Sequence, residues 1–250
     1  MHYTAECKTI TYEGVRILTS CIVDCRLTEY EMKSLDNLDL NVILCPKSDK
    51  VYEAISSHPD IQLFFPKDNI VIVQKNIDIE LIEILKELGK KPILSSKSLA
   101  HNYPHDIILN SLILGDLFLH NLKNTDESIL NHLDDKVKKV HVNQGYTKCS
   151  TAIVSDTAAI TSDKGIYTAL KTNLIDVLYV PPGNIILEGL DYGFIGGTCG
   201  LLDEKNMAFF GSLDKYLYGN EVKDFLKKYK VEYHYLMNTM LTDRGSLFAF

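Results

Sequence analysis

The sequence predicts an α/β protein in which one strand–turn–strand–helix–strand unit recurs five times, as an α/β propeller with pseudo-five-fold symmetry. Three observations predict it. Short apolar strands come in pairs joined by turns of two to four residues, an amphipathic helix follows each complete pair, and the apolar run 247–250 has no unit after it. Closely joined strands favour antiparallel hairpins over βαβ crossovers. We therefore expect a single domain over residues 1–250, made of five ββαβ repeats.

The first unit lacks its leading strand. One strand is expected at 15–23, a helix follows with Thr28 and Glu31 as a capping box, and the third strand is expected at 41–45. The leftover strand at 246–250 can supply the missing one. Pairing the two would close the ring and remove the open edge of the sheet.

The second unit shows the pattern most clearly. Its strands are expected at 61–65, 70–73 and 92–94. Between the last two, the apolar residues of a helix are spaced i, i+3, i+4, i+7, and a glycine ends it: Leu81, Ile84, Leu85, Leu88 and Gly89.

The remaining three units repeat this order. The third has strands at 107–114, 117–120 and 137–142, and a helix that opens at Asn124 with Glu127 reaching back. The fourth has strands at 150–154, 158–161 and 177–180 around a helix at 163–170. The fifth has strands at 199–203, 207–211 and 231–236 around a helix through 222–229. A doubly wound parallel sheet would also alternate strands with helices, but it would not place two strands before each helix.

Composition narrows the classes of partner. The net charge of −7 gives no electrostatic footprint for nucleic acid, and the locally basic run 223–230 reads as a solvated helix face. No stretch approaches the length of a membrane span, and the first ten residues lack the apolar core of a signal peptide. Six cysteines occur without CxxC or zinc-ligand spacing, so reduced thiols in the cytoplasm are expected, with no metal and no cofactor.

A unit of this kind repeated five times about an axis resembles the pentein fold of guanidine-modifying enzymes, which include arginine deiminases, dimethylarginine hydrolases and amidinotransferases. The resemblance covers roughly residues 15–250. Its motifs are the polar residues before each leading strand and the C-terminal "GSL". The stretches "QGYTKCS" (144–150) and "GGTCG" (196–200) resemble an uncharacterised bacterial branch of that superfamily.

The resemblance implies a catalytic set of acid, histidine and cysteine, in which the cysteine attacks the guanidinium carbon. Asp106 matches the position of the acid. The expected histidine position holds Lys148, Cys149 and Ser150, and the nucleophile position in the Gly-Ser-Leu-x-Cys ending holds Ala249. Hydrolysis of arginine, agmatine or methylated arginines by the usual set is therefore not expected.

Polar residues before the leading strands remain as candidates for an axial pocket. The candidates for catalysis are Cys199, Cys149 and Lys148, with Lys148 lowering the pKa of a thiol; the candidates for binding are Asp60, Asp106, Asp243, Arg244 and Ser246. Each also has a structural interpretation: the acids as turn caps, the cysteines as small buried residues, and Lys148 and Arg244 as surface charges or ion-pair partners.

Three functions compete. The first is a small-molecule enzyme or binder whose pocket suits a zwitterion such as an amino acid or a guanidino compound. The second is a non-catalytic interaction module, as the ribosome anti-association factor of this fold is. The third, an unrelated α/β hydrolase or nucleotide binder, is disfavoured because GxSxG, GxGxxG and the Walker loop are missing. The sequence leaves the oligomeric state open.

Overall fold

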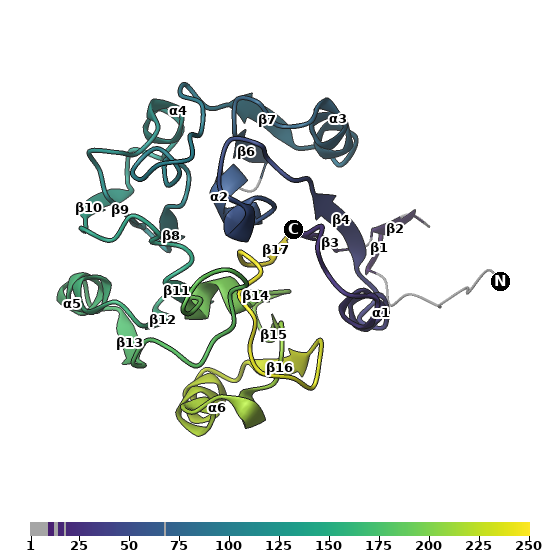
Figure 1. The fold of residues 1–250 in the computed structure, drawn as a ribbon, viewed down its shortest axis with the longest axis vertical. Coiled ribbons are helices and arrows are strands. Elements are labelled where there is room, and N and C mark those ends of the chain that lie inside the picture. The colour runs from purple at the N-terminus through teal and green to yellow at the C-terminus, as the bar shows by residue number, and fades with distance from the viewer. Residues whose placement is uncertain (1–9, 13–14, 18, 68) are drawn as a thin grey trace.

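The structure is a computed structural model that describes residues 10–12, 15–17, 19–67 and 69–250. It shows an α/β fold with five small three-stranded sheets. Figure 1 shows the sheets arranged around a centre, with helices α1, α3, α4, α5 and α6 toward the periphery and α2 further in. Within the described residues, no helix is long and apolar enough to cross a bilayer.

Four sheets have the same strand order. In each, the leading strand is antiparallel to the middle strand, and the middle strand is parallel to the third, with a helix between them in sequence. The elements are β5 (Leu63–Lys67), β6 (Ile70–Val73), α3 (Ile79–Glu87) and β7 (Lys91–Leu94); β8 (Leu112–Leu114), β9 (Leu117–His120), α4 (Glu127–Leu130) and β10 (Lys138–His141); β11 (Thr151–Ser155), β12 (Ala158–Thr161), α5 (Lys164–Thr172) and β13 (Asp176–Tyr179); and β14 (Cys199–Leu201), β15 (Asn206–Phe209), α6 (Gly219–Lys228) and β16 (Glu232–Tyr235).

The fifth sheet joins the two ends of the described chain. Its members are β17 (Phe248–Ala249), β3 (Ser20–Asp24), α1 (Glu29–Asp36) and β4 (Asn41–Cys45). Phe248 lies opposite Ile22 in an antiparallel pair, and Phe250 exchanges two backbone hydrogen bonds with Ser20. The predicted pairing of the C-terminal strand with the first unit is confirmed, although the strand is shorter than expected.

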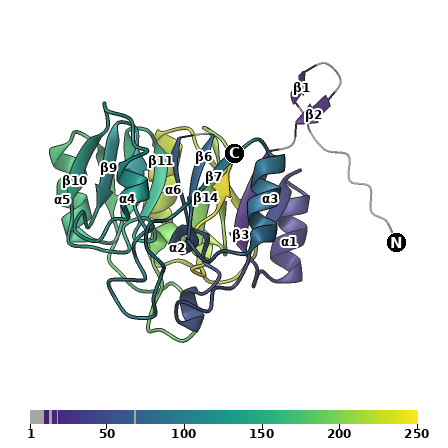
Figure 2. The same cartoon turned by 90° about the horizontal axis from the view of Figure 1, so that it is seen from above.

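Three strand predictions are wrong in detail. The strand expected at 15–23 is divided: β2 (Val15–Ile17) pairs with β1 (Ile10–Tyr12) in a separate hairpin, and β3 begins at Ser20. Figure 2 shows this hairpin apart from the five sheets. The strand expected from Ile61 begins only at Leu63, because Pro59 opens the short helix α2 (Pro59–Gln62).

The strand expected at 107–114 is reduced to β8, because Asn110 breaks the apolar run. Its backbone N–H closes a turn on the carbonyl of Ile107, and its side chain accepts hydrogen bonds from the backbone N–H groups of Lys148 and Cys149. Short 3₁₀ turns complete the fold: η1 (Glu53–Ile55), η2 (Ile195–Thr198) and η3 (Leu213–Lys215).

Helix capping follows the sequence in one case and departs from it in another. Thr28 and Glu31 form the predicted capping box of α1. At α4 the N-cap is Asp126 and not Asn124, since the Asp126 carboxylate accepts the N–H of Ser128. The apolar faces of the helices pack on the sheets, as when Leu81 and Leu85 of α3 join the core around Val71.

A buried histidine in the core makes stability depend on pH. His120 bonds Thr125 through Nδ1 (2.7 Å) and the carbonyl of Gly145 through Nε2 (3.1 Å), and burial lowers its pKa from 6.5 to about 4. Between pH 6.5 and pH 4 the unfolded chain therefore carries a proton on this histidine that the folded chain does not carry. The folded state is fully stable in this respect above pH 6.5, and its free energy of unfolding falls as the pH is lowered toward 4. Denaturant unfolding should show wild type losing about 2 kcal/mol more than His120→Gln between pH 7 and pH 5; equal losses would contradict this.

Candidate functional site

Three polar side chains meet near the starts of three different leading strands. Asp60 lies on α2, Cys149 lies two residues before β11, and Ser246 lies two residues before β17. The Oδ2 atom of Asp60 accepts hydrogen bonds from Cys149 Sγ (2.9 Å) and Ser246 Oγ (2.8 Å). Lys148 Nζ donates to Ser246 Oγ at 2.8 Å. Four of the candidate residues therefore form one buried group, which we call the axial network.

Close approach of the backbone builds the axial network. Gly245 has a φ of +67°, and a Cβ added there would overlap the side chain of His58, so the segment before β17 can lie against α2 only with glycine at this position. The Gly245 carbonyl then accepts the N–H of Asp60 at 3.1 Å. Asn110 completes the support, because its Nδ2 donates to Cys149 Sγ (3.2 Å) and to the Asp60 carbonyl (3.0 Å).

His58, which the sequence did not single out, lies fully buried beside the axial network. Its Nε2 is 3.8 Å from Asp24 Oδ2, and its Nδ1 is 3.9 Å from Asp243 Oδ1. Neither ring nitrogen has a hydrogen-bond partner among the described residues, and Asp60 Oδ1 also lacks one there. His58, Asp60 and Cys149 each offer an atom within 4.8 Å of the others, so these three could hold a metal ion.

Burial sets the protonation of this group. It raises the pKa values of Asp60 and Asp243, although Lys148 opposes the shift at Asp60 and His58 opposes it at Asp243. Burial also lowers the pKa of His58. The pKa of Cys149 is raised well above its usual value by burial and by the charges of Asp60 and Asp243. The ammonium of Lys148 is bonded to Ser246 and not to the thiol of Cys149, whose pKa stays raised, whereas at Cys199 the charge of Lys148 opposes the rise in pKa that burial causes.

A cavity of about 240 Å³ opens beside Cys149, and we call it the tyrosine cavity. Cys149, His58 and Asp243 line it together with aromatic and aliphatic side chains, which are Tyr52, Ile55, Tyr146, Leu187, Leu190, Tyr192 and Phe194, and with Asp191. The rings of Tyr146 and Phe194 stack with centroids 6.0 Å apart, and Tyr192 meets Phe194 edge-on at 6.2 Å. The site is therefore an aromatic hollow with acids, an imidazole and a thiol on its walls.

The other predicted binding residues lie outside the axial network. Asp106 accepts a hydrogen bond from the hydroxyl of Tyr146, so it contacts a wall of the tyrosine cavity rather than the axial network. Asp243 accepts from the backbone N–H groups of Phe194 and Gly245. Arg244 forms an ion pair with Glu31 of α1 at 3.2 Å, as its structural interpretation predicted.

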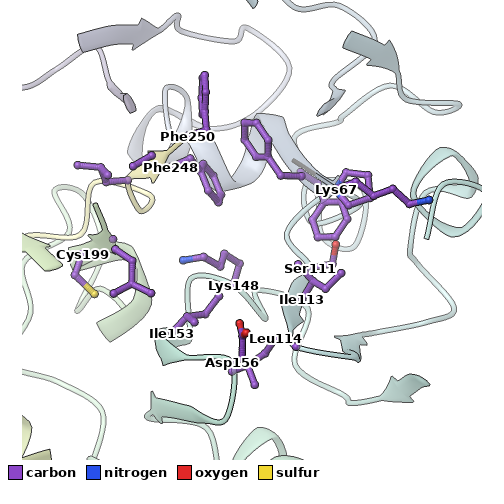
Figure 3. Close-up of a pocket in the computed structure, with 18 of the residues that line it drawn as sticks. Lys67, Ser111, Ile113, Leu114, Lys148, Ile153, Asp156, Cys199, Phe248 and Phe250 are labelled. Atoms are coloured by element: carbon purple, nitrogen blue, oxygen red, sulfur yellow. The ribbon is translucent and has the colours of Figure 1, made fainter. Parts of the chain in front are cut away.

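Cys199 does not join Cys149. It is the first residue of β14 rather than a residue before it, and its Sγ donates to the Ile195 carbonyl at 3.6 Å. Burial raises its pKa to about 11. Cys199 lines a second cavity of about 850 Å³, shared with Lys148 and Phe248 and shown in Figure 3. The strand-start residues therefore do not surround one cavity, because Cys149 and Cys199 line different ones.

Sequence reasoning missed His58 and the aromatic walls. A signal for His58 was present, since "HPD" at 58–60 places it two residues before Asp60 and resembles "PHD" at 104–106. The aromatic residues carried no such signal. Tyr52, Tyr146 and Tyr192 stand in three separate loops, and only the fold brings them together.

Solved structures of guanidino-modifying enzymes resemble this fold. SxtG, an amidinotransferase from Microseira wollei in the saxitoxin pathway, is 11% identical with a TM-score of 0.57, over 87% of this chain and 88% of its own. A DDAH from Pseudomonas aeruginosa, complexed with citrulline, is 10% identical with a TM-score of 0.51, over 89% and 93%. The inosamine-phosphate amidinotransferase of Streptomyces griseus is 10% identical with a TM-score of 0.55, over 83% and 73%.

These enzymes have the pentein fold, and the predicted resemblance to that superfamily is confirmed at the level of fold. No curated protein matches the sequence. A family model does match, over residues 22–248, with the description "Family of unknown function (DUF6873)". The chain, with its pentein fold and its buried group of Asp60, Cys149, Ser246 and Lys148, therefore belongs to the family DUF6873.

Proposed function

We propose that the protein is a thiol-dependent enzyme that acts on a small cationic compound, with a guanidino or amidino group, in the tyrosine cavity. One observation carries the proposal: Cys149, His58 and Asp243 line the same cavity as four aromatic side chains. The structural relatives named above include amidinotransferases and a DDAH complexed with citrulline, which supports this class of ligand.

The walls of the tyrosine cavity favour a planar cation. Aromatic faces attract cations within about 6 Å, and Tyr146 and Phe194 already stack as two such faces. Asp243, buried nearby, supplies a carboxylate for the N–H groups of a guanidinium. Binding of a cation would also relieve the cost of burying Asp243, because an opposite charge lowers a raised carboxyl pKa.

The same cation would activate the thiol. In the free protein the raised pKa keeps Cys149 protonated. A positive charge within about 4–6 Å lowers such a pKa by about 1–3 units. His58, whose lowered pKa keeps it neutral, can then accept the proton. The thiolate forms a bond to the central carbon of the ligand, the C–N bond breaks, and the departing amine takes the proton from His58. Water then attacks the same carbon and gives up a proton to His58, the C–S bond breaks to release a product with a ureido group, and the thiolate regains a proton.

This set of residues differs from the one that the resemblance implied. Ala249 stands at the expected nucleophile position. In this proposal Cys149 is the nucleophile and His58 accepts its proton, and both residues come from repeats other than the one that holds Ala249. The second candidate is a non-catalytic interaction module. The high pKa of Cys149 favours it, because a protonated thiol is a weak nucleophile.

The proposal extends to the architecture and the location. We infer that the five sheets form one propeller domain over residues 1–250 that β17 closes, since β17 pairs with β3 and contacts β14, and β11 contacts β8 and β14. Five free cysteines among the described residues support a cytoplasmic protein. The net charge of −7 supports a small-molecule partner rather than nucleic acid.

Alkylation of Cys149 tests the activation. At pH 6 the free protein should react with iodoacetamide slowly at both Cys149 and Cys199, because both pKa values are raised. A guanidino compound that stabilises the protein in a thermal-shift screen should then raise labelling of Cys149 at least about tenfold, and leave Cys199 unchanged. Mass spectrometry of the labelled peptides gives both rates. Labelling of Cys149 that stays slow with every stabilising compound supports the interaction module.

Turnover tests the role of each cysteine. With a compound from the screen, Cys149→Ser should lower kcat at least about 10³-fold, since the remaining groups act only together with the nucleophile. Cys199→Ser is the matched control, because Cys199 is equally buried but lines the other cavity, and it should stay within about threefold of wild type. Unchanged turnover in Cys149→Ser would reject the mechanism, and the absence of any stabilising guanidino or amidino compound would reject the ligand class.

A further inference from the structure

Two members of the axial network line two cavities of different character. Cys149 lines the tyrosine cavity, and its neighbour Lys148 lines the cavity of about 850 Å³, which we call the phenylalanine cavity. Phe64, Phe65, Phe248 and Phe250 contribute its aromatic walls, and Figure 3 shows Lys148 among the lining residues, between Phe248 and Ile153. The volume lies within the range of about 300–1,000 Å³ that small-molecule sites occupy.

A buried ammonium stands at this cavity. Lys148 is only 8% exposed, and its Nζ has one hydrogen-bond acceptor among the described residues, the hydroxyl of Ser246. An ammonium carries three N–H donors. The nearest carboxylate of the axial network, Asp60, is bonded to Ser246 and Cys149, and not directly to Lys148. A buried charge with unused donors is costly, and an anionic partner would lower that cost.

Aromatic surface surrounds the ammonium. The Phe65 ring lies 5.3 Å from the Phe248 ring and 5.6 Å from the Phe250 ring, between centroids, and all three side chains are only partly buried. The Lys148 ammonium lies 5.6 Å from the centre of the Phe248 ring. A ligand seated here would thus place an anionic group against Lys148 and apolar atoms against these rings, and would remove apolar surface from water.

The other charges at the cavity disfavour a ligand with several negative charges. Asp116 and Asp156 also line it and would repel a multiply charged anion. Of the remaining cations, Lys67 lies 4.0 Å from Asp134, and Figure 3 shows it pointing away from Lys148. Lys90 lies with its Nζ 4.2 Å from the centre of the Phe250 ring. Lys148 is therefore the cation that a ligand deep in the cavity would meet.

We propose that the phenylalanine cavity is a second binding site, for a small monocarboxylate with an apolar or aromatic body. The carboxylate accepts hydrogen bonds from Lys148 Nζ, and the body packs against Phe65, Phe248 and Phe250. This site is distinct from the tyrosine cavity and does not rest on the chemistry proposed for Cys149.

Matched ligands test the charge requirement on the wild-type protein. The probes are 4-phenylbutyrate, 4-phenylbutanol and 4-phenylbutylamine, which share a body and differ in the head group. Isothermal titration should show the carboxylate binding at least about tenfold more tightly than the alcohol and the amine. Equal affinity of the carboxylate and the alcohol would overturn the proposal, and so would tighter binding of the amine.

A tryptophan at either cavity locates the ligand, because the natural chain has no tryptophan. In a Phe248→Trp variant, 4-phenylbutyrate should change the fluorescence in a saturable manner, and the alcohol and the amine should again bind more weakly. In a Phe194→Trp variant, which reports on the tyrosine cavity, it should change nothing. A fluorescence change with 4-phenylbutyrate in Phe194→Trp alone would overturn the proposal. A fluorescence change in Phe194→Trp with a guanidino compound would concern the proposed enzyme site and not this second site.

Removal of the ammonium tests its role. Lys148→Met keeps the apolar stem and should weaken 4-phenylbutyrate at least about tenfold, with little effect on 4-phenylbutanol. Lys67→Met is the matched control and should leave both affinities within about twofold, because this lysine lies next to Asp134. Unchanged affinity of the carboxylate in Lys148→Met would overturn the proposal. If that variant does not fold, the comparison of ligands on wild type and on Phe248→Trp still decides.

Discussion

Deletion of residues 246–250 should leave the protein largely unfolded at 25 °C. Leu247 is 3% exposed and packs in the core with Val23, Leu35 and Phe210. Burial of a leucine contributes about 2–3 kcal/mol, and the deletion also removes the backbone bonds between Phe250 and Ser20. The total loss should exceed about 5 kcal/mol, which is comparable to the whole stability of many domains.

Circular dichroism and thermal melting measure this result. Leu247→Ala gives an intermediate case, since it keeps β17 and creates only a cavity, and it should cost about 2–4 kcal/mol. A truncated protein that melts within about one degree of the full chain would show that β17 is not needed to complete the sheet of β3 and β4.

Gly245→Ala should destabilise the protein by about 4 kcal/mol. The residue has a φ of +67°, where a side chain costs about 1–2 kcal/mol. An added Cβ would also overlap the side chain of His58 and lie 2.5 Å from its Cα, so α2 and the segment before β17 would have to separate. Such overpacking costs a further 1–3 kcal/mol, roughly.

Gly89→Ala provides the matched control. Gly89 has a φ of +75°, but a Cβ added there meets no atom within 4 Å. It should cost only about 1 kcal/mol, the conformational part alone. Urea unfolding of both variants measures the difference. Equal losses for the two would mean that the approach of Gly245 to His58 adjusts without cost.

The sequence predicted the third strands of all five sheets and the middle strands of four of them well, because these strands are local apolar runs next to an amphipathic helix; the exception is β3, which is only part of the run expected at 15–23. It also predicted the pairing of the C-terminal strand, because one unit lacked a strand and one strand lacked a unit. The leading strands were the least accurate. In the run 107–114, Asn110 binds the backbone of Lys148 and Cys149, and this tertiary contact overrides the β propensity of the apolar residues around it.

Part of the candidate site could be predicted from the positions of its residues in the repeats. Asp60, Cys149 and Ser246 precede their strands and meet, as their positions in the repeats suggested. Cys199 was placed with them because it stands at the start of its leading strand, but its side chain lines the other cavity. His58 was missed because its importance comes from the two buried carboxylates beside it, which lie far away in the chain.

The pairing of β17 with β3 also fixes when this protein can finish folding in a cell. Ile22 and Phe248 are partners, and 248 − 22 = 226 positions separate them. At ribosomal rates of about 5–20 residues per second, β3 leaves the ribosome roughly 10–45 s before its partner. During that time the hydrogen-bonding edge of β3 has no mate within the chain, and a nascent β3 is open to pairing with other strands. Completion of the first sheet therefore waits until β17 has been synthesised, and a chaperone that covers the emerging β3 would protect its unpaired edge in the meantime.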